Sequence, residues 1–167
     1  MRTTLSILCV LVCMISTSQN MTNQKLEQII TSTTDSIEGS SGRWQFKIND
    51  VIFICLTDST NNRMRIISPI AEASAVDNDA IRASMIANFH TALDVKYAIA
   101  DNILWSAYIH PLKELTEDQV KDAISQVYYA NVNFGTTYAS TSLIFPGRED
   151  EKEETPKKKG TLEKRKF

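Results

Sequence analysis

Apolar residues recur at helical spacing in three separate stretches of the chain. They predict helices near 22–38, over 79–93, and from a capping box at 116–119 to near Gly135. In a globular protein an amphipathic helix packs its apolar stripe against another surface. The three stripes consist of Leu26, Ile29, Ile30, Thr33 and Ile37; Ile81, Met85 and Phe89; and Val120, Ile124, Val127, Tyr128 and Phe134.

Shorter stretches between these helices have the pattern of β-strands. Alternation or continuous apolar character predicts strands over 44–48, 51–56, 64–67, 95–99 and 103–109. The second of these is apolar throughout, so we expect a central strand that is covered on both faces. The pairs 49–50 and 101–102 combine Asn and Asp, which tolerate positive φ and therefore predict tight hairpin turns. The predicted order is α-β-β-β-α-β-β-α.

The beginning of the chain differs from this patterned middle. Arg2 precedes an apolar run over 5–15, and small residues follow up to Ser18. This is the pattern of a secretory signal peptide over 1–18, cleaved near Ser18 and Gln19. The run of 11 residues is shorter than the ~20 that a membrane-spanning helix needs, so the mature chain is expected to have no span. Retention as an uncleaved anchor is the alternative.

The last segment, 148–167, is an acidic block followed by a basic block. It holds 8 Lys or Arg and 6 Asp or Glu and few apolar side chains. Such a segment buries too little surface to offset the entropy of ordering it, so we expect a disordered tail. The alternative is an electrostatic tether to a charged surface. The predicted organisation is a signal peptide over 1–18, one domain over 19–147, and a tail over 148–167.

Composition limits the class of protein. The 167 residues are 43% hydrophobic and 23% charged, which excludes a collagen-like, wholly disordered or multi-span membrane chain. The net charge of -2 gives no indication of nucleic-acid binding. It conceals an acidic body, because 19–147 holds 9 Lys or Arg against 14 Asp or Glu, a charge of -5.

Candidate chemistry is sparse. His90 and His110 stand outside any metal-binding or nucleophile motif, so a catalytic pair with Asp94 or Asp101 is only a minor alternative. No pattern identifies a catalytic residue, a metal site or a cofactor. Of three cysteines, Cys55 alone lies outside the predicted signal, and we interpret it as a buried apolar residue rather than a reactive thiol or an intermolecular disulfide.

Five segments together resemble the type III secretion chaperone-like fold, most closely its YbjN and CesT (Tir chaperone) types. The resemblance covers about residues 23–140. It implies an α+β fold with an antiparallel sheet packed against helices. The segments are Arg43-Trp44-Gln45-Phe46; 63–70, which contains Arg-Met-Arg-Ile-Ile-Ser-Pro; 88–98, which contains Asn-Phe-His-Thr-Ala-Leu; 104–112, which contains Leu-Trp-Ser-Ala-Tyr; and Phe134-Gly135-Thr136-Thr137-Tyr138.

The resemblance implies a non-enzymatic module that forms homodimers and binds extended segments of partner proteins, by strand addition or side-chain docking. Secretion chaperones act in the cytosol, whereas this chain has an export signal. We therefore expect a relative used in the periplasm or outside the cell. The alternatives are an envelope protein tethered by its tail, and a small-ligand protein or enzyme that uses the histidines. Candidate residues for a partner or dimer surface are Trp44, Phe46, Phe89, Trp105 and Tyr108.

Overall fold

The computed structural model describes residues 20–34 and 36–141, so the predicted signal peptide and charged tail lie outside the described residues. The described chain forms one six-stranded antiparallel sheet in the order β1-β2-β3-β4-β6-β5. The helices are α2 (Asn23–Thr33), α3 (Asn78–His90) and α4 (Glu117–Val132), with a 3-10 turn η2 at Ala73–Ala75. The strands are β1 (Ile37–Ser40), β2 (Arg43–Ile48), β3 (Val51–Asp58), β4 (Arg63–Glu72), β5 (Lys96–Ala100) and β6 (Ile103–His110).

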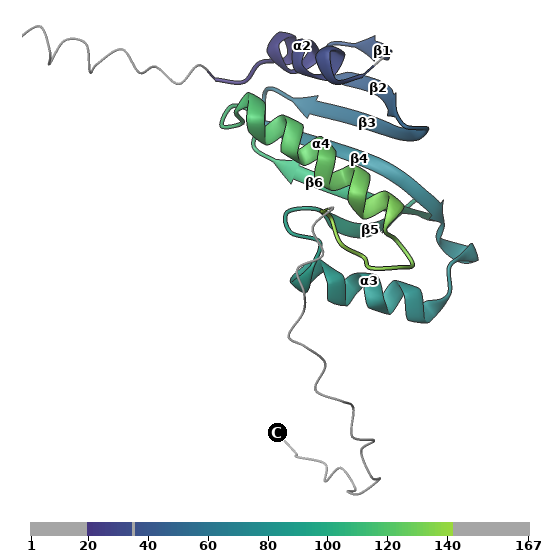
Figure 1. Ribbon diagram of the computed structural model, residues 1–167. Helices are drawn as coiled ribbons and strands as arrows, with labels where there is room; N and C mark the ends of the chain where they lie inside the picture. Colours follow the sequence, from purple (N-terminus) through teal and green to yellow (C-terminus); the bar gives the residue numbers. More distant parts are fainter. Residues whose placement is uncertain (1–19, 35, 142–167) are drawn as a thin grey trace, which may run out of the picture.

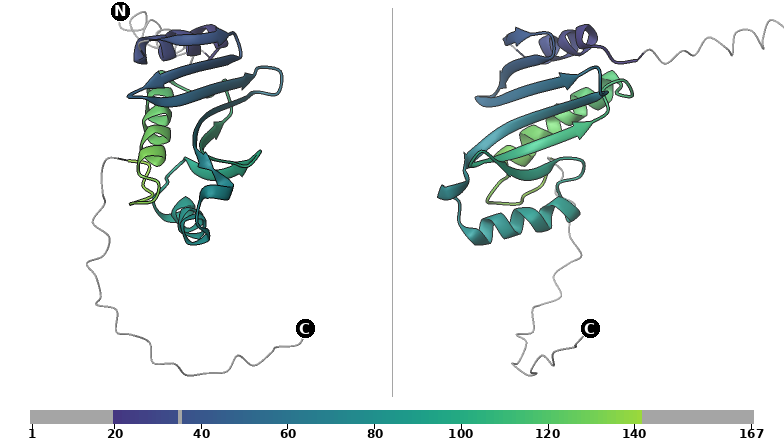
Figure 2. Two further views of the ribbon diagram at one scale, coloured as in Figure 1. Left: turned by 90° about the vertical axis from the view of Figure 1, so that its right-hand side faces the viewer. Right: turned by 180° about the vertical axis from the view of Figure 1, so that it is seen from behind.

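Helices α2 and α4 lie over the same face of the sheet, and α3 lies beyond the edge strand β5 (Figure 1). Viewed from behind, the central strands have none of the described helices in front of them (Figure 2). This is the α+β class with an antiparallel sheet packed against helices that the sequence predicted, and the prediction is confirmed. The sheet nevertheless has one strand more than predicted.

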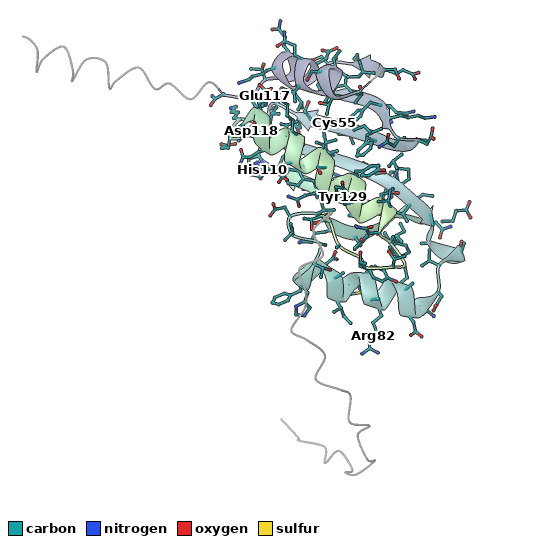
Figure 3. The ribbon with its side chains drawn as sticks, viewed as in Figure 1. Cys55, Arg82, His110, Glu117, Asp118 and Tyr129 are labelled. Carbon is teal, nitrogen blue, oxygen red and sulfur yellow. The ribbon has the colours of Figure 1, made fainter. Side chains whose placement is uncertain are left out.

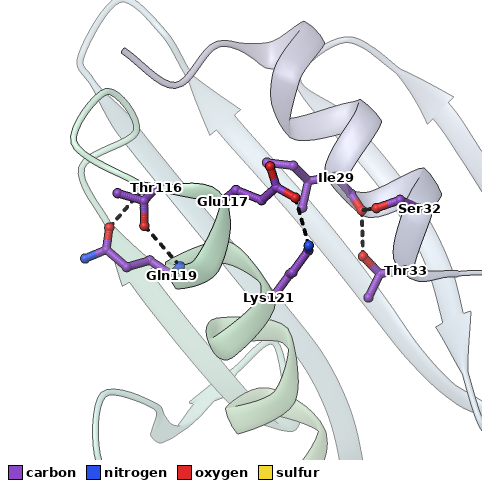
Figure 4. A network of polar contacts seen from close by, with 7 residues as sticks. All are labelled: Ile29, Ser32, Thr33, Thr116, Glu117, Gln119 and Lys121. Atoms are coloured by element: carbon purple, nitrogen blue, oxygen red, sulfur yellow. Dashed lines mark hydrogen bonds and ion pairs between the residues drawn. The ribbon is translucent and has the colours of Figure 1, made fainter. Parts of the chain in front are cut away.

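The additional strand, β1, takes up the end of the first predicted helix. Helix α2 begins at an N-cap in which Thr22 Oγ1 accepts from the Lys25 amide, and it stops at Thr33 instead of residue 38. Hydroxyls of Ser32 and Thr33 both donate to the Ile29 carbonyl, at 2.7 and 2.6 Å (Figure 4). Such side-chain bonds compete with the helical ladder and favour helix ends. The chain then extends and pairs with β2.

Both predicted hairpin turns are confirmed. Asn49 and Asp50 have φ of 47° and 67°, and Asp101 and Asn102 have φ of 51° and 59°. Two successive positive φ values give the turn whose twist matches that of the strands it joins. A third turn, between β3 and β4, is closed by Asp58, whose carboxylate accepts from the amide of Asn61.

Strand β4 is longer than the predicted 64–67, because Pro69 does not end it. The register with β6 shifts between Pro69 and Ala71, so the proline occupies an irregularity in the ladder. The Asn131 amide of α4 donates to the carbonyl of Pro69 and to Ser68 Oγ, both at 2.8 Å. Helix α4 thus supplies the polar partner that keeps this part of the strand in place.

The core fills the space between the sheet and helices α2 and α4. Phe46 and Phe53 stack there with ring centroids 5.1 Å apart, beside Trp44. Helix α4 begins with the predicted capping box, in which Thr116 Oγ1 accepts from the Gln119 amide and the Gln119 side chain accepts from Thr116 (Figure 4). The buried residues of α4 are Val120, Ala123, Ile124, Gln126, Val127 and Ala130.

The segment after α4 packs back onto β5. The Tyr97 hydroxyl donates to the Ala130 carbonyl at 2.8 Å, and the rings of Phe134 and Tyr138 lie edge-on to the Tyr97 ring. The amide of Ser140 donates to the Thr91 carbonyl, so this segment also reaches the end of α3. Tyr97 is therefore the link among the edge strand, α4 and the C-terminal segment.

This link predicts the effect of removing one hydroxyl. Tyr97→Phe leaves the Ala130 carbonyl without its side-chain donor, and we expect the free energy of unfolding to fall by about 1–2 kcal/mol. Tyr129→Phe is the control, because among the described residues no hydrogen bond involves the Tyr129 hydroxyl. Urea denaturation followed by circular dichroism measures both variants. Equal stabilities of the two would contradict the assigned role of Tyr97.

Candidate docking surfaces

Helix α3 turns an apolar surface to solvent. Met85, Ile86 and Phe89 are 67%, 55% and 87% exposed, and Leu93 just after the helix is 47% exposed. The helix instead buries Ser84 and Ala87 against the rest of the chain. We call Met85, Ile86, Phe89 and Leu93 the α3 patch. Single exposed apolar residues are ordinary, but a contiguous group on one element is typical of an interaction site.

An amide side chain fixes α3 beside the sheet. Asn88 donates to the Tyr97 carbonyl at 3.1 Å and accepts from the Tyr97 amide at 2.7 Å. It therefore satisfies both backbone groups of Tyr97 on the edge strand β5. A strand added along this edge would have to displace Asn88, which makes the middle of β5 a poor template for strand addition.

The second uncovered surface is the sheet face opposite α2 and α4. Because successive side chains in a strand point to opposite faces, this face is given by the strand register. We call it the open sheet face; the right-hand view of Figure 2 shows this side of the sheet. The face carries Arg43, Gln45, Lys47, Ile52, Ile54, Leu56, Arg65, Ile67, Trp105, Ala107 and Ile109.

This surface corrects one expectation about the second predicted strand. Strand β3 is central in the sheet, but it is covered on one face only by the described chain. Its Phe53 and Cys55 are buried in the core, whereas Ile52, Ile54 and Leu56 are half-buried on the open sheet face. A continuous apolar run shows that both faces of the strand are apolar; it does not show that both are covered.

Three shallow hollows lie along the open sheet face. One of ≈ 260 Å³ is lined by Arg65, Ile67, Trp105 and Ile109, with alanines of β5 and Asp101. A second of ≈ 290 Å³ lies between β1 and β3 and includes Arg43 and Ile54. The third, also ≈ 290 Å³, includes Leu56, Arg63 and Arg65. Each hollow therefore combines an aliphatic side chain with at least one arginine and one carboxylate, which is Asp101, Glu38 and Asp58 in turn.

The structure divides the five candidate surface residues into two groups. Trp44, Phe46 and Tyr108 are 1%, 2% and 6% exposed, so they belong to the core and not to a surface of the described chain. Their strand positions place them on the face that α2 and α4 cover. Phe89 lies in the α3 patch, and Trp105 lies on the open sheet face, where its Nε1 donates to the Ala100 carbonyl at 3.2 Å. These two remain candidates.

Sequence reasoning missed the half-buried aliphatic residues of the open sheet face and the basic residues among them. Their signal was present as every second residue of β2, β3 and β4, such as Arg43, Ile54 and Arg65. Period-two alternation indicates which residues share a face of each strand. It does not indicate which face the helices cover.

The histidines occupy separate environments. His90, at the end of α3, is exposed and lies edge-on to Phe89 with ring centroids 4.9 Å apart. His110, at the end of β6, has Nδ1 2.8 Å from the Pro111 carbonyl and stacks on Tyr108. Asp94 is engaged by Gln126, which accepts from the Asp94 amide at 3.1 Å. The two rings thus have different neighbours, and neither contacts Asp94 or Asp101 in the described structure.

Residues 20–34 and 36–141 contain no group of three or more His, Cys, Asp or Glu side chains placed to hold a metal ion. Among the helices within these ranges, none has the length and apolar content needed to cross a membrane.

Comparison with solved structures finds the same fold. A chain of the HopA1–SchA chaperone–effector complex aligns with a TM-score of 0.53 and 10% identity, over 65% of this chain and 88% of its own. A chain of the ExsC–ExsE complex gives 0.52 and 9%, over 67% and 95%. A chain of the complex of the Yersinia pestis type III secretion chaperone SycH with a stable fragment of YscM2 gives 0.49 and 11%, over 67% and 98%.

The protein therefore has a type III secretion chaperone-like fold, as the sequence resemblance implied. No protein-family model and no curated protein matches the sequence. The closer relationship to the YbjN and CesT types stays a prediction.

The burial difference between two phenylalanines predicts opposite mutational outcomes. Phe46→Ala removes a stacked core ring and should lower the free energy of unfolding by about 3–5 kcal/mol. Phe89→Ala truncates a ring that is 87% exposed and should change it by less than about 0.5 kcal/mol. Urea denaturation at low micromolar concentration compares them. A large loss for Phe89→Ala would mean that the ring is covered in the folded protein.

Burial also predicts that Cys55 is unreactive. Desolvation raises the pKa of its thiol to about 12, so the thiolate that reacts is scarce at neutral pH. With Cys9 and Cys13 replaced by Ser, a thiol reagent such as Ellman's reagent should label the native chain far more slowly than the urea-unfolded chain. Equally fast labelling would contradict the buried position and restore the reactive-thiol alternative.

Proposed function

We propose that this chain is a non-enzymatic protein-interaction module that is exported, binds segments of partner proteins and forms homodimers. The observation that carries the proposal is the apolar surface left uncovered on a type III secretion chaperone-like fold, at the α3 patch and on the open sheet face. Folds of this size normally bury such groups, so two uncovered surfaces favour partners. Catalysis has no comparable support, because the histidines have separate neighbours.

The two surfaces suit different tasks. The α3 patch consists of large aliphatic and aromatic side chains on one helix and just after it. Pairing it with the same patch on a second copy gives a self-complementary interface of the kind that twofold dimers use. Met85 and Phe89 are separated by one helical turn, so two antiparallel α3 helices would bring apolar side chains together along their lengths.

Export rests on the sequence of the first 18 residues, and we place the protein in the periplasm or outside the cell. There the module binds partner proteins outside the cytosol, whereas secretion chaperones act inside it. The charged tail provides the support for the second candidate, an envelope-associated protein tethered through 148–167.

The dimer proposal predicts a loss of association when a charge enters the α3 patch. Phe89→Asp would bury a carboxylate in the interface without a partner, so we expect a dimer to become a monomer at high micromolar concentration. Ile109→Asp, which adds the same charge to the open sheet face, should leave the dimer intact. Light scattering coupled to gel filtration measures the mass of both variants.

Three outcomes decide the question. A monomeric unmutated chain at these concentrations would remove the homodimer from the proposal. A dimer that Ile109→Asp breaks and Phe89→Asp does not would move the interface to the sheet. A dimer that becomes a monomer with Phe89→Asp but not with Ile109→Asp would support the α3 patch as the interface.

A further inference from the structure

The open sheet face carries a row of side chains whose charged members are all basic, although the domain is acidic. The described residues hold nine Lys or Arg and thirteen Asp or Glu, a charge of -4. Yet Arg43 and Lys47 on β2 and Arg65 on β4 project from this face, and Arg63 lies at the start of β4. Acidic side chains border the same face: Glu38 lines the hollow of Arg43, Asp58 that of Arg63 and Arg65, and Asp101 that of Arg65 and Trp105.

The basic groups of this face form no ion pair within the described chain. The one ion pair among residues 20–34 and 36–141 joins Lys121 to Glu117 on α4, on the other side of the molecule. Arg43, Lys47 and Arg65 are all exposed. Unpaired positive charges beside aliphatic side chains create a surface that attracts carboxylates and apolar groups together.

The strand register arranges these groups in a row. Arg43 is paired with Leu56, Leu56 with Arg65, and Arg65 with Ile109. Basic and aliphatic side chains therefore alternate across β2, β3, β4 and β6, with one step per strand, or about 4.8 Å. The next row, Gln45, Ile54, Ile67 and Ala107, is apolar over its last three positions.

The spacing of the side chains along this row matches a helical ligand better than an extended one. Side chains on one face of a helix recur about every 5.4 Å along its axis, close to the strand spacing of about 4.8 Å. Same-side residues of an extended chain are about 6.8 Å apart, so they leave register after two steps. A helix lying across the strands can thus place a carboxylate opposite Arg43 and Arg65 and an aliphatic side chain opposite Leu56 and Ile109.

We infer that the open sheet face binds an amphipathic helix of a partner protein in which acidic and aliphatic side chains alternate along one face. The inference rests on the proposed binding of partner segments and adds where the segment binds and what chemistry it carries. Arg65 is central to the site, because it lies in the row and lines two of the three hollows.

The test uses the full-length chain and three labelled peptides of about 15 residues. In the first, Glu and Leu alternate along one helical face; in the others, Lys or Gln replaces each Glu. We expect the Glu peptide to bind most tightly by fluorescence anisotropy. Raising the salt from 0.05 to 0.5 M should weaken it several-fold, because the contacts are exposed.

Charge-reversal variants locate the site. Arg65→Glu and Arg43→Glu should each weaken the Glu peptide by at least about fivefold, since an attraction becomes a repulsion. Arg82→Glu makes the same charge change on α3, away from the sheet (Figure 3), and should alter affinity by less than about twofold. Circular dichroism melting confirms folding, and Arg65→Gln replaces any variant that fails to fold.

The outcomes separate this inference from the proposed function. Equal binding of all three peptides, or an Arg65→Glu chain that binds like the unmutated one, would overturn the acidic-helix inference and leave segment binding in place. Binding of no peptide would also overturn it, while the dimer measurement still tests the proposed module. A gain of about fivefold on deleting 148–167 would show that the acidic block of the chain itself occupies the face.

Discussion

Helix α4 lies across strands β4 and β6 and determines which face of the sheet becomes the core. Its apolar side chains, among them Ile124 and Val127, pack onto the strands, and its polar groups satisfy buried groups of the sheet. Ser106 Oγ donates to the Val127 carbonyl at 3.2 Å, and Tyr97 donates to that of Ala130. Buried hydroxyls need such partners, because an unsatisfied one costs about 1–3 kcal/mol. The α4 interface therefore combines apolar packing with hydrogen bonds that fix the position of the helix along the strands.

The rest of the architecture follows from this contact. With α4 on one side, α2 packs beside it and closes the core over β2 and β3. The segment 134–140 returns along Tyr97 to Thr91 and joins α4 to the end of α3. Asn88 then fixes α3 at the edge of the sheet. Hydrogen bonds thus orient the apolar contacts of α4 and α3, and the arrangement leaves α3 beside the sheet and the opposite face open.

A sheet with one open face suits the proposed binding, because the strand ladder fixes the spacing of its side chains before a partner arrives. Less ordering is then required on binding, which favours affinity. The arginines add selectivity by charge to the aliphatic residues of this surface. The α3 patch has no such charges within it, which suits contact between identical copies, where like charges would meet and repel.

The sequence alone determined most of the fold, because its main elements depend on local physics. The capping box at Thr116, the two positive-φ turns and the strand alternation act over a few residues and appear at the predicted places. Long-range packing decided the rest. Trp44 and Trp105 both lie in alternating strands, yet one is in the core and the other on the open sheet face, because α4 covers only one side. Likewise, Ile37 became part of β1 because pairing with β2 was available to it. Periodicity marks which residues share a face, and only the tertiary structure decides what, if anything, covers that face.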